Sequence, residues 1–247
     1  MPGFGPDQGV TTDATSSGSN SYPSLRHIDF LLVGGGVASA VAAETLRAEG
    51  AAGSILILSQ EDVPPYHRPP LSKKMLLDAD IERQIFVHPE SFYREKAIDL
   101  QLNARVASVD PANHTITTAT GERIQYGRLL IATGATPRPL LVPGADLAGI
   151  HTLRQIADAE MVRQAATQAK RAAVLGGSFL GMEIAMSLVE LGLDVTILEF
   201  GARLLPHLES ADLSAHFQRY VESRGVSVLL NDTVRRQHPW HRFTVEI

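Results

Sequence analysis

Two glycine-rich turns are the features of this sequence whose residue types and spacing most directly suggest chemistry. Gly34, Gly35 and Gly36 end an apolar run, and an alanine-rich helical pattern begins at Val37. Glycines at such a turn let backbone N–H groups approach a pyrophosphate at the positive end of the following helix. The third small position of the motif is Ser39, which still permits close contact between helix and strand. The turn predicts a dinucleotide site, and a strand–helix turn without a ligand is the alternative.

A second turn of the same kind consists of Gly176, Gly177, Ser178, Phe179, Leu180 and Gly181. It also follows an apolar run and precedes a helical pattern, so two dinucleotide sites in one chain become the favoured interpretation. Ser178 stands where the backbone approaches a pyrophosphate most closely. Its β-carbon is expected to weaken or displace the phosphate contact, unless its hydroxyl adds a hydrogen bond.

A carboxylate follows the second strand of each predicted unit, at the position where such folds hydrogen-bond the adenosine ribose. In the first unit the candidates are Glu61 and Asp62, which come 27 and 28 residues after Gly34. A solvated acidic turn is the alternative there. In the second unit the candidate is Glu199, 23 residues after Gly176. A carboxylate favours a ribose 2′-hydroxyl and repels a 2′-phosphate, so NADH is predicted over NADPH.

Two cations stand at the ends of a proline-rich string between the two turns. Residues 68–73 read Arg-Pro-Pro-Leu-Ser-Lys. The prolines force an extended backbone and then suit the first turn of a helix that runs to about Leu77. This 68–73 string is a stiff mount that can hold Arg68 and Lys73 against an anionic or electron-rich ligand. A rigid loop before a helix is the alternative.

The elements that must position these residues are predicted from hydrophobic periodicity. Helices are expected at 37–47, 153–170, 182–191 and 213–224, and buried strands at 30–33, 54–58, 128–131, 172–175, 194–198 and 226–230. Short β-leaning runs within 106–125, separated by turn residues, indicate an antiparallel meander. Residues 243–245 are expected to add an edge strand. The predicted fold class is α/β, with two Rossmann-like units and a small meander.

Composition narrows the class of protein. The 247 residues carry a net charge of −5 with both signs interspersed, which argues against nucleic acid or an anionic membrane as a partner. The absence of cysteine excludes disulfides, thiolate metal sites and a redox-active dithiol. No apolar run approaches the ~20 residues that span a bilayer. A cytoplasmic protein is therefore expected.

The two ends of the sequence differ from the rest. Residues 1–24 are rich in Gly, Ser, Thr and Pro and predict a disordered tail without a signal core. Residues 235–242 are basic and aromatic and predict a solvated terminus. His238 and His241 have too few neighbouring ligands for a metal site, so no metal is expected.

The first glycine turn together with residues 66–73, Tyr-His-Arg-Pro-Pro-Leu-Ser-Lys, resembles the flavin domain of the ferredoxin reductase and apoptosis-inducing-factor group. These are FAD-dependent pyridine nucleotide oxidoreductases. The resemblance implies that residues 25–140 form the N-terminal part of a FAD-binding domain and residues 141–247 an incomplete NAD(P)-binding domain. It also implies that NADH reduces FAD, which then passes electrons to an acceptor such as a ferredoxin or rubredoxin.

The resemblance further implies roles for particular residues. Lys73 and Glu183 match a Lys–Glu pair beside the flavin and the nicotinamide, and they are the expected catalytic residues. Phe179 matches an aromatic that screens the flavin face, with core packing as the alternative. The expected cofactor contacts outside the two turns, besides Lys73 and the carboxylates, are Ala38, Arg68, Val106, Ala132, Thr133, Gly134 and Arg154. For Arg154 the alternative is a surface arginine in the first turn of a helix.

The pattern of the group extends beyond residue 247. It includes an Ala-x-Gly-Asp segment whose Asp binds the ribityl and phosphate region of the flavin, and this chain has no such segment. We therefore expect an oxidoreductase fold that is incomplete at its C-terminus and binds FAD poorly. The alternatives are a non-catalytic NAD-binding or partner-binding remnant and a flavoprotein of the nitrite reductase or monodehydroascorbate reductase type.

Overall fold

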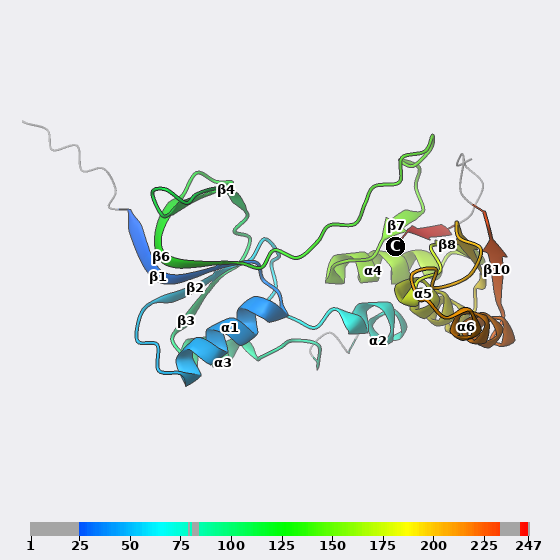
Figure 1. Ribbon diagram of the computed structural model, residues 1–247, viewed down its shortest axis with the longest axis horizontal. Coiled ribbons are helices and arrows are strands. Elements are labelled where there is room, and N and C mark those ends of the chain that lie inside the picture. The colour runs from blue at the N-terminus through cyan, green and yellow to red at the C-terminus, as the bar shows by residue number, and fades with distance from the viewer. Residues whose placement is uncertain (1–24, 79, 81–83, 233–242, 247) are drawn as a thin grey trace, which may run out of the picture.

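The computed structural model describes residues 25–78, 80, 84–232 and 243–246. Two α/β units lie side by side, and a long loop arches between them (Figure 1). The predicted α/β fold with two Rossmann-like units and a meander is confirmed. The tail predicted at 1–24 and the two histidines His238 and His241 lie outside the described residues.

The first sheet has the strand order β3-β2-β1-β6-β5-β4. β1, β2, β3 and β6 are parallel, whereas β4, β5 and the start of β6 form the predicted antiparallel meander. One face of the parallel part of the sheet packs on helices α1 and α3, and the other face packs on the meander, toward which the sheet curls. The bounds are β1 (Arg26–Val33), α1 (Val37–Ala48), β2 (Ile55–Leu58), α3 (Glu90–Glu95), β3 (Ile98–Gln101), β4 (Val106–Asp110), β5 (Thr115–Thr118) and β6 (Arg123–Ile131).

Strand β6 corrects the prediction of a separate buried strand at 128–131. The strand continues directly from the meander, and the side chains of Leu130 and Ile131 are 39% and 60% exposed. Within the described residues β1 pairs with all of 128–131, while β5 pairs only with 123–125. The apolar sequence is that of a buried strand, but one edge of this stretch has no neighbouring strand in the described part of the chain.

The second sheet has the strand order β10-β9-β8-β11-β7 and is parallel throughout. The prediction of an edge strand at 243–245 is wrong, because β11 lies between β8 and β7, and the short strand β7 takes the edge. The bounds are β7 (Ile150–Thr152), α4 (Ile156–Ala166), β8 (Arg171–Leu175), α5 (Phe179–Glu190), β9 (Asp194–Glu199), α6 (Ala211–Ser223), β10 (Val226–Leu230) and β11 (Phe243–Glu246).

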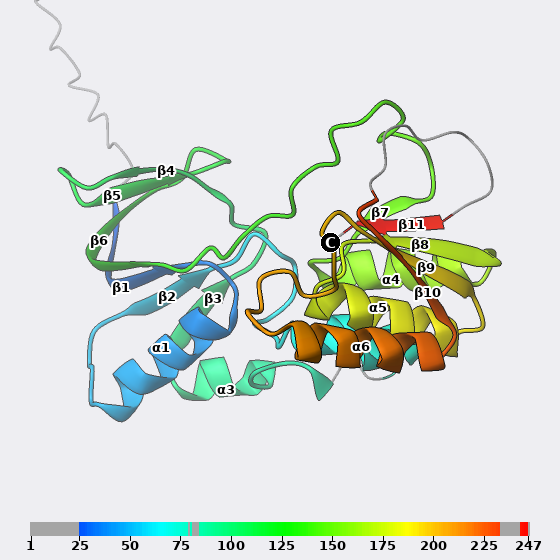
Figure 2. The same ribbon diagram turned by 45° about the vertical axis from the view of Figure 1, so that its right-hand side comes forward.

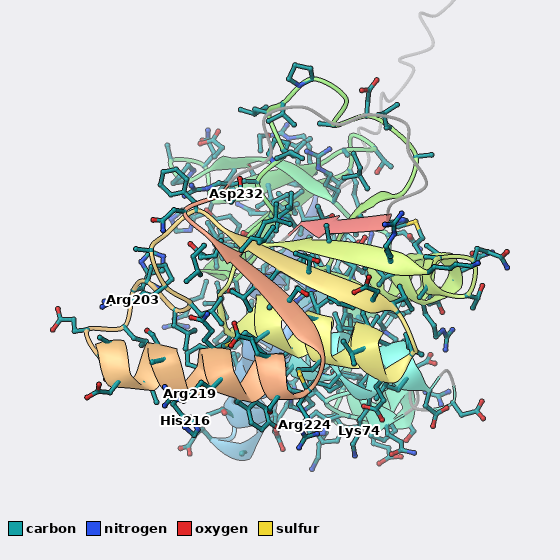
Figure 3. The ribbon with its side chains drawn as sticks, turned by 90° about the vertical axis from the view of Figure 1, so that its right-hand side faces the viewer. Lys74, Arg203, His216, Arg219, Arg224 and Asp232 are labelled. Carbon is teal, nitrogen blue, oxygen red and sulfur yellow. The ribbon has the colours of Figure 1, made fainter. Side chains whose placement is uncertain are left out.

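Helix α6 runs along the outside of the second unit. It buries Ser214 and Val221 toward the unit and leaves Arg219 exposed. Figure 3 shows Arg219 on this helix, Arg224 just after its carboxyl end, and Asp232 beyond β10 at the opposite end of that strand. Among the described residues, none of the helices has the length and apolar composition that crossing a bilayer requires.

A segment from the first half of the sequence belongs to the core of the second unit. The 3-10 turn Pro69–Ser72 and helix α2 (Lys74–Leu77) carry Leu71, Met75 and Leu76. These side chains are buried among those of α4 and α5. Figures 1 and 2 accordingly show α2 against α4 and α5 rather than beside α1. The chain therefore crosses between the units before and after this segment, and again through the extended residues 132–141.

Candidate functional site

A cavity of about 590 Å³ lies at the carboxyl ends of β1, β2 and β6, where the first unit meets the start of the second. Its volume is in the range of small-molecule and cofactor pockets, roughly 300–1,000 Å³. The cavity brings together much of the predicted set, namely Gly34, Gly35, Gly36, Ala38, Glu61, Arg68, Val106, Ala132, Thr133, Gly134 and Arg154.

The first glycine turn leaves space for a ligand against its backbone. Gly34 has a φ of +125°, and a β-carbon there would lie 2.2 Å from the carbonyl oxygen of Ala132. A β-carbon on Gly36 would meet no atom within 4 Å. Gly36 is also the N-cap of α1, and no side chain caps the helix at this end. The N–H groups of the first helical turn are thus free of a side-chain cap and fit a diphosphate.

Glu61 is held by two side chains that follow it in the sequence. The Tyr66 hydroxyl donates to Glu61 Oε2 at 2.6 Å, and Arg68 Nη2 donates to Oε1 at 2.8 Å. Arg68 Nη1 also donates to the Tyr66 hydroxyl and to the carbonyl oxygen of Arg154. Burial, followed by the hydrogen bond to Glu61, raises the pKa of Tyr66, so its hydroxyl stays protonated. Each oxygen of Glu61 keeps a further lone pair for a ribose hydroxyl.

The residues that line this cavity but were not singled out from the sequence include three with polar side chains that matter here, Tyr66, Arg105 and Asp158. Arg105 adds a third cation to Arg68 and Arg154. Asp158 Oδ2 accepts the backbone N–H groups of Arg154 and Gln155, both at 2.8 Å. These bonds start α4 at Ile156, later than predicted. The signal was present in the sequence, because an acid three residues after a polar N-cap is a capping pattern.

A second cavity, of about 300 Å³, lies between the 68–73 string and the start of α5. It is lined by Lys73, Phe179, Leu180 and Glu183, and it shares Arg68 and Arg154 with the first cavity. Lys73 Nζ lies 2.7 Å from Glu183 Oε2, although the residues are 110 positions apart. The fold thus brings together the two residues that were expected to act as a pair.

Phe179 begins α5, and its side chain is 51% exposed at the wall of the second cavity. Its ring stands edge-on to that of Phe217 on α6, with 5.8 Å between the ring centroids. This exposure does not match the core-packing alternative. A screening role for Phe179 stays a prediction.

The second glycine turn lies at the carboxyl ends of β8 and β9. The first N–H of each turn donates to a backbone oxygen, and in the second turn side chains also accept the N–H groups of Gly177 and Gly181. Ser178 caps α5, since its hydroxyl accepts the Gly181 N–H at 3.5 Å. Glu199 is buried and accepts the N–H groups of Gly177 and Gly201, both at 2.6 Å. Glu199 therefore fixes the turn, and its contact with a ribose stays a prediction, as do the nucleotide contacts of Gly176 and Ser178.

A family model described as pyridine nucleotide-disulphide oxidoreductase matches residues 28–243. The chain is 40% identical over 206 residues to the 5,5′-dehydrodivanillate O-demethylase ferredoxin reductase subunit of a Sphingobium species, covering 83% of this chain and 50% of that protein. It is 36% identical over 201 residues to a rubredoxin-NAD(+) reductase of Pseudomonas putida, covering 81% of this chain and 52% of that protein.

Solved structures with the same fold include a ferredoxin reductase from Rhodopseudomonas palustris. It superposes with a TM-score of 0.84 at 28% identity, over 88% of this chain and 58% of that one. The reductase in a covalent putidaredoxin reductase–putidaredoxin complex gives a TM-score of 0.83 at 25% identity, over 89% and 58% of the two chains. The chain spans about half the length of the curated relatives it matches.

Proposed function

Because the chain belongs to the pyridine nucleotide-disulphide oxidoreductases, we propose that it is a FAD-dependent oxidoreductase. In this proposal it takes electrons from NAD(P)H, with NADH preferred, and passes them to a small iron–sulfur protein such as a ferredoxin or rubredoxin. The observation that carries the proposal is the contact between Lys73 and Glu183, in a cavity that shares two cationic residues with the cavity at the first glycine turn.

We propose that FAD is held in the larger cavity. The uncapped N-terminus of α1 suits its diphosphate, and Glu61 suits its ribose. When bound, the flavin would accept a hydride from the nicotinamide and pass the electrons on to the acceptor. Under this proposal residues 25–140 are the FAD-binding part and residues 141–247 the NAD(P)-binding part.

Lys73 is proposed to orient the reacting rings. Its ammonium group has three N–H donors, of which Glu183 takes one and the carbonyl oxygen of Pro69 takes another at 3.4 Å, so one remains for a polar atom of a ligand. The Lys73 side chain is 47% exposed and the Glu183 side chain 34% exposed, so both can reach a ligand in the cavity. Bringing two reactants into one fixed geometry is a large part of what an enzyme supplies to such a transfer.

The acceptor and the location are also part of the proposal. Relatives named as ferredoxin and rubredoxin reductases support an iron–sulfur acceptor. The neighbouring structure of a reductase joined to putidaredoxin supports the same class of partner. We propose a cytoplasmic location, as expected from the sequence.

The test compares two adjacent lysines. The protein is purified with added FAD, and NADH-driven bleaching of the flavin absorbance is followed by anaerobic stopped flow. Lys73→Ala should slow flavin reduction by about tenfold or more, because a positioned charge at the reacting rings is lost. Lys74→Ala removes the same charge one residue later, at an exposed position of α2, and should leave the rate within about twofold of the parent.

Equal rates for the parent and Lys73→Ala would remove Lys73 from the mechanism. A parent protein that holds FAD but is not reduced by NADH would overturn the proposed function. Calorimetric binding of NADH without bound flavin or turnover would instead indicate a nucleotide-binding protein without catalysis.

A further inference from the structure

Two buried serines join the 68–73 string to α5. The Ser72 side chain is 1% exposed, and its Oγ donates to Glu183 Oε2 at 2.6 Å. Ser187 is also buried, and its hydroxyl donates to the carbonyl oxygen of Ser72 at 2.8 Å. Glu183 and Ser187 are one helical turn apart, so they present neighbouring groups on the same face of α5. Ser72 is therefore held by α5 through both its side chain and its backbone.

The carboxylate of Glu183 is bound by two consecutive residues of the string. Ser72 Oγ and Lys73 Nζ both reach Oε2, at 2.6 and 2.7 Å. The two donors differ in how firmly they can hold it. Lys73 is a long, half-exposed side chain, and an ion pair of that kind holds its partner weakly. The Ser72 hydroxyl is buried and only two bonds from its Cα, and a short hydrogen bond to an ionised oxygen is among the stronger kinds.

The alternative partner of the Ser72 hydroxyl is a poorer one. The carbonyl oxygen of Pro69 lies 3.3 Å from Ser72 Oγ, within its own 3-10 turn. A buried hydroxyl donates to the better of the acceptors within reach, which here is the carboxylate of Glu183. The hydrogen bond from Ser72 therefore fixes the position of Glu183 Oε2, the same oxygen that Lys73 contacts.

We infer that Ser72 is a positioning residue, which fixes the carboxylate of Glu183 so that Lys73 and Glu183 present one geometry to the cavity. Ser187 supports this arrangement by holding the backbone of Ser72. The inference rests on the proposed function, because the geometry of the pair affects a rate only if hydride transfer occurs there. Ser72 itself need not touch a ligand for this role.

A double-mutant cycle tests whether Ser72 acts through Glu183. In the stopped-flow assay, Ser72→Ala should slow flavin reduction by about tenfold, the size expected for loss of one hydrogen bond to a charged group. The NADH concentration at half-saturation should change by less than about twofold. In a Glu183→Ala background, Ser72→Ala should slow reduction by less than about twofold, because the group it positions is already gone. An equal slowing in both backgrounds would overturn the inference.

Ser214→Ala is the matched control, because Ser214 is equally buried but bonds the backbone oxygen of Ser210, the N-cap of α6. It should leave the reduction rate unchanged. A second readout needs no flavin: the ¹³C-carboxyl resonance of Glu183, assigned by its loss in Glu183→Ala. Ser72→Ala should shift or broaden that resonance, and Ser214→Ala should not. An unmoved resonance in Ser72→Ala would overturn the positioning role, whether or not NADH reduces the parent protein. Failure of NADH to reduce the parent protein would count only against the proposed function.

Discussion

Tyr66 and Tyr93 are both buried, but their hydroxyl groups meet different surroundings. The Tyr66 hydroxyl donates to Glu61 and accepts from Arg68. The Tyr93 hydroxyl has no hydrogen-bond partner within the described residues. A buried hydroxyl stabilises the fold when it is bonded and costs free energy when it is not. The same substitution should therefore have different consequences at the two positions.

At position 66, Tyr66→Phe should lower the free energy of unfolding by about 1–2 kcal/mol, because Glu61 and Arg68 each lose a buried partner. Urea denaturation measures the change. Tyr220→Phe, on the exposed side of α6, is the control and should have no measurable effect. An unfolding free energy equal to that of the parent would show that the Glu61–Tyr66–Arg68 contacts do not hold this region.

At position 93, Tyr93→Phe should leave stability at neutral pH unchanged or slightly raised. Burial, followed by the charge of Glu44, raises the pKa of Tyr93 to about 12, above its ordinary value near 10. A raised folded-state pKa contributes stability that is fully present below about pH 10 and is lost as the pH rises to about 12. Tyr93→Phe should therefore flatten the alkaline fall in urea midpoint. A fall of equal steepness in both proteins would contradict this.

At the scale of the elements, Arg47 joins three segments of the first unit. It stands in the last turn of α1, and its guanidinium donates to the carbonyl oxygens of Ala51 and Gly53 in the loop before β2. It also donates to those of Lys96 and Ala97, between α3 and β3. The planar fork of an arginine can meet four acceptors at once, which the single ammonium of a lysine cannot.

Arg47→Lys should therefore lower the free energy of unfolding by about 2 kcal/mol, although the charge is kept, because it leaves carbonyl oxygens unpaired. Arg219→Lys on the exposed face of α6 is the matched control and should change it by less than about 0.5 kcal/mol. Chemical denaturation at neutral pH compares the two. Similar values for both variants would show that the charge alone matters at position 47.

The strength of the local signal decides which elements the sequence predicts. Strand β2 is four consecutive buried residues, and α5 is an apolar helix after a glycine turn, so both were found within a few residues. Strand β7 has three half-buried residues and no periodicity to detect. The place of β11 between β8 and β7 depends on long-range pairing, which a local pattern does not encode. The exposure of Ile131 likewise depends on long-range pairing, because β5 pairs only with residues 123–125 of β6.

At the scale of the whole molecule, Leu76 belongs by sequence to the first half but lies in the core of the second unit, where it is completely buried. Leu76→Ala should lower the free energy of unfolding by about 3 kcal/mol, the usual cost of such a cavity. Leu141→Ala in the connector, where the leucine is 89% exposed, is the control. Hydrogen exchange of α5 should rise in Leu76→Ala only. Exchange rates that match the parent would place α2 outside that core.

The candidate site was predictable in parts for related physical reasons. Glycine turns and the residues that follow a strand carry local signals, so Gly34 and Glu61 could be named from the sequence. The pairing of Lys73 with Glu183 came from family resemblance, because 110 residues separate them. Ser72 was missed because its role arises from contact with a residue 111 positions away, which only the folded chain brings near. Asp158 and Tyr66 instead bond residues three to five positions away, and the capping pattern at Asp158 was a local signal that went unused.

The placement of α2 means that the loop 132–141 is not what keeps the two halves of the protein in register. If the chain were expressed as two polypeptides divided between Leu140 and Leu141, the piece carrying Leu71 and Leu76 would still insert these side chains into the other piece. The two polypeptides should co-elute from a sizing column as a 1:1 pair, and Leu76→Asp should separate them. Their elution as separate species without that substitution would mean that the covalent tether is indispensable.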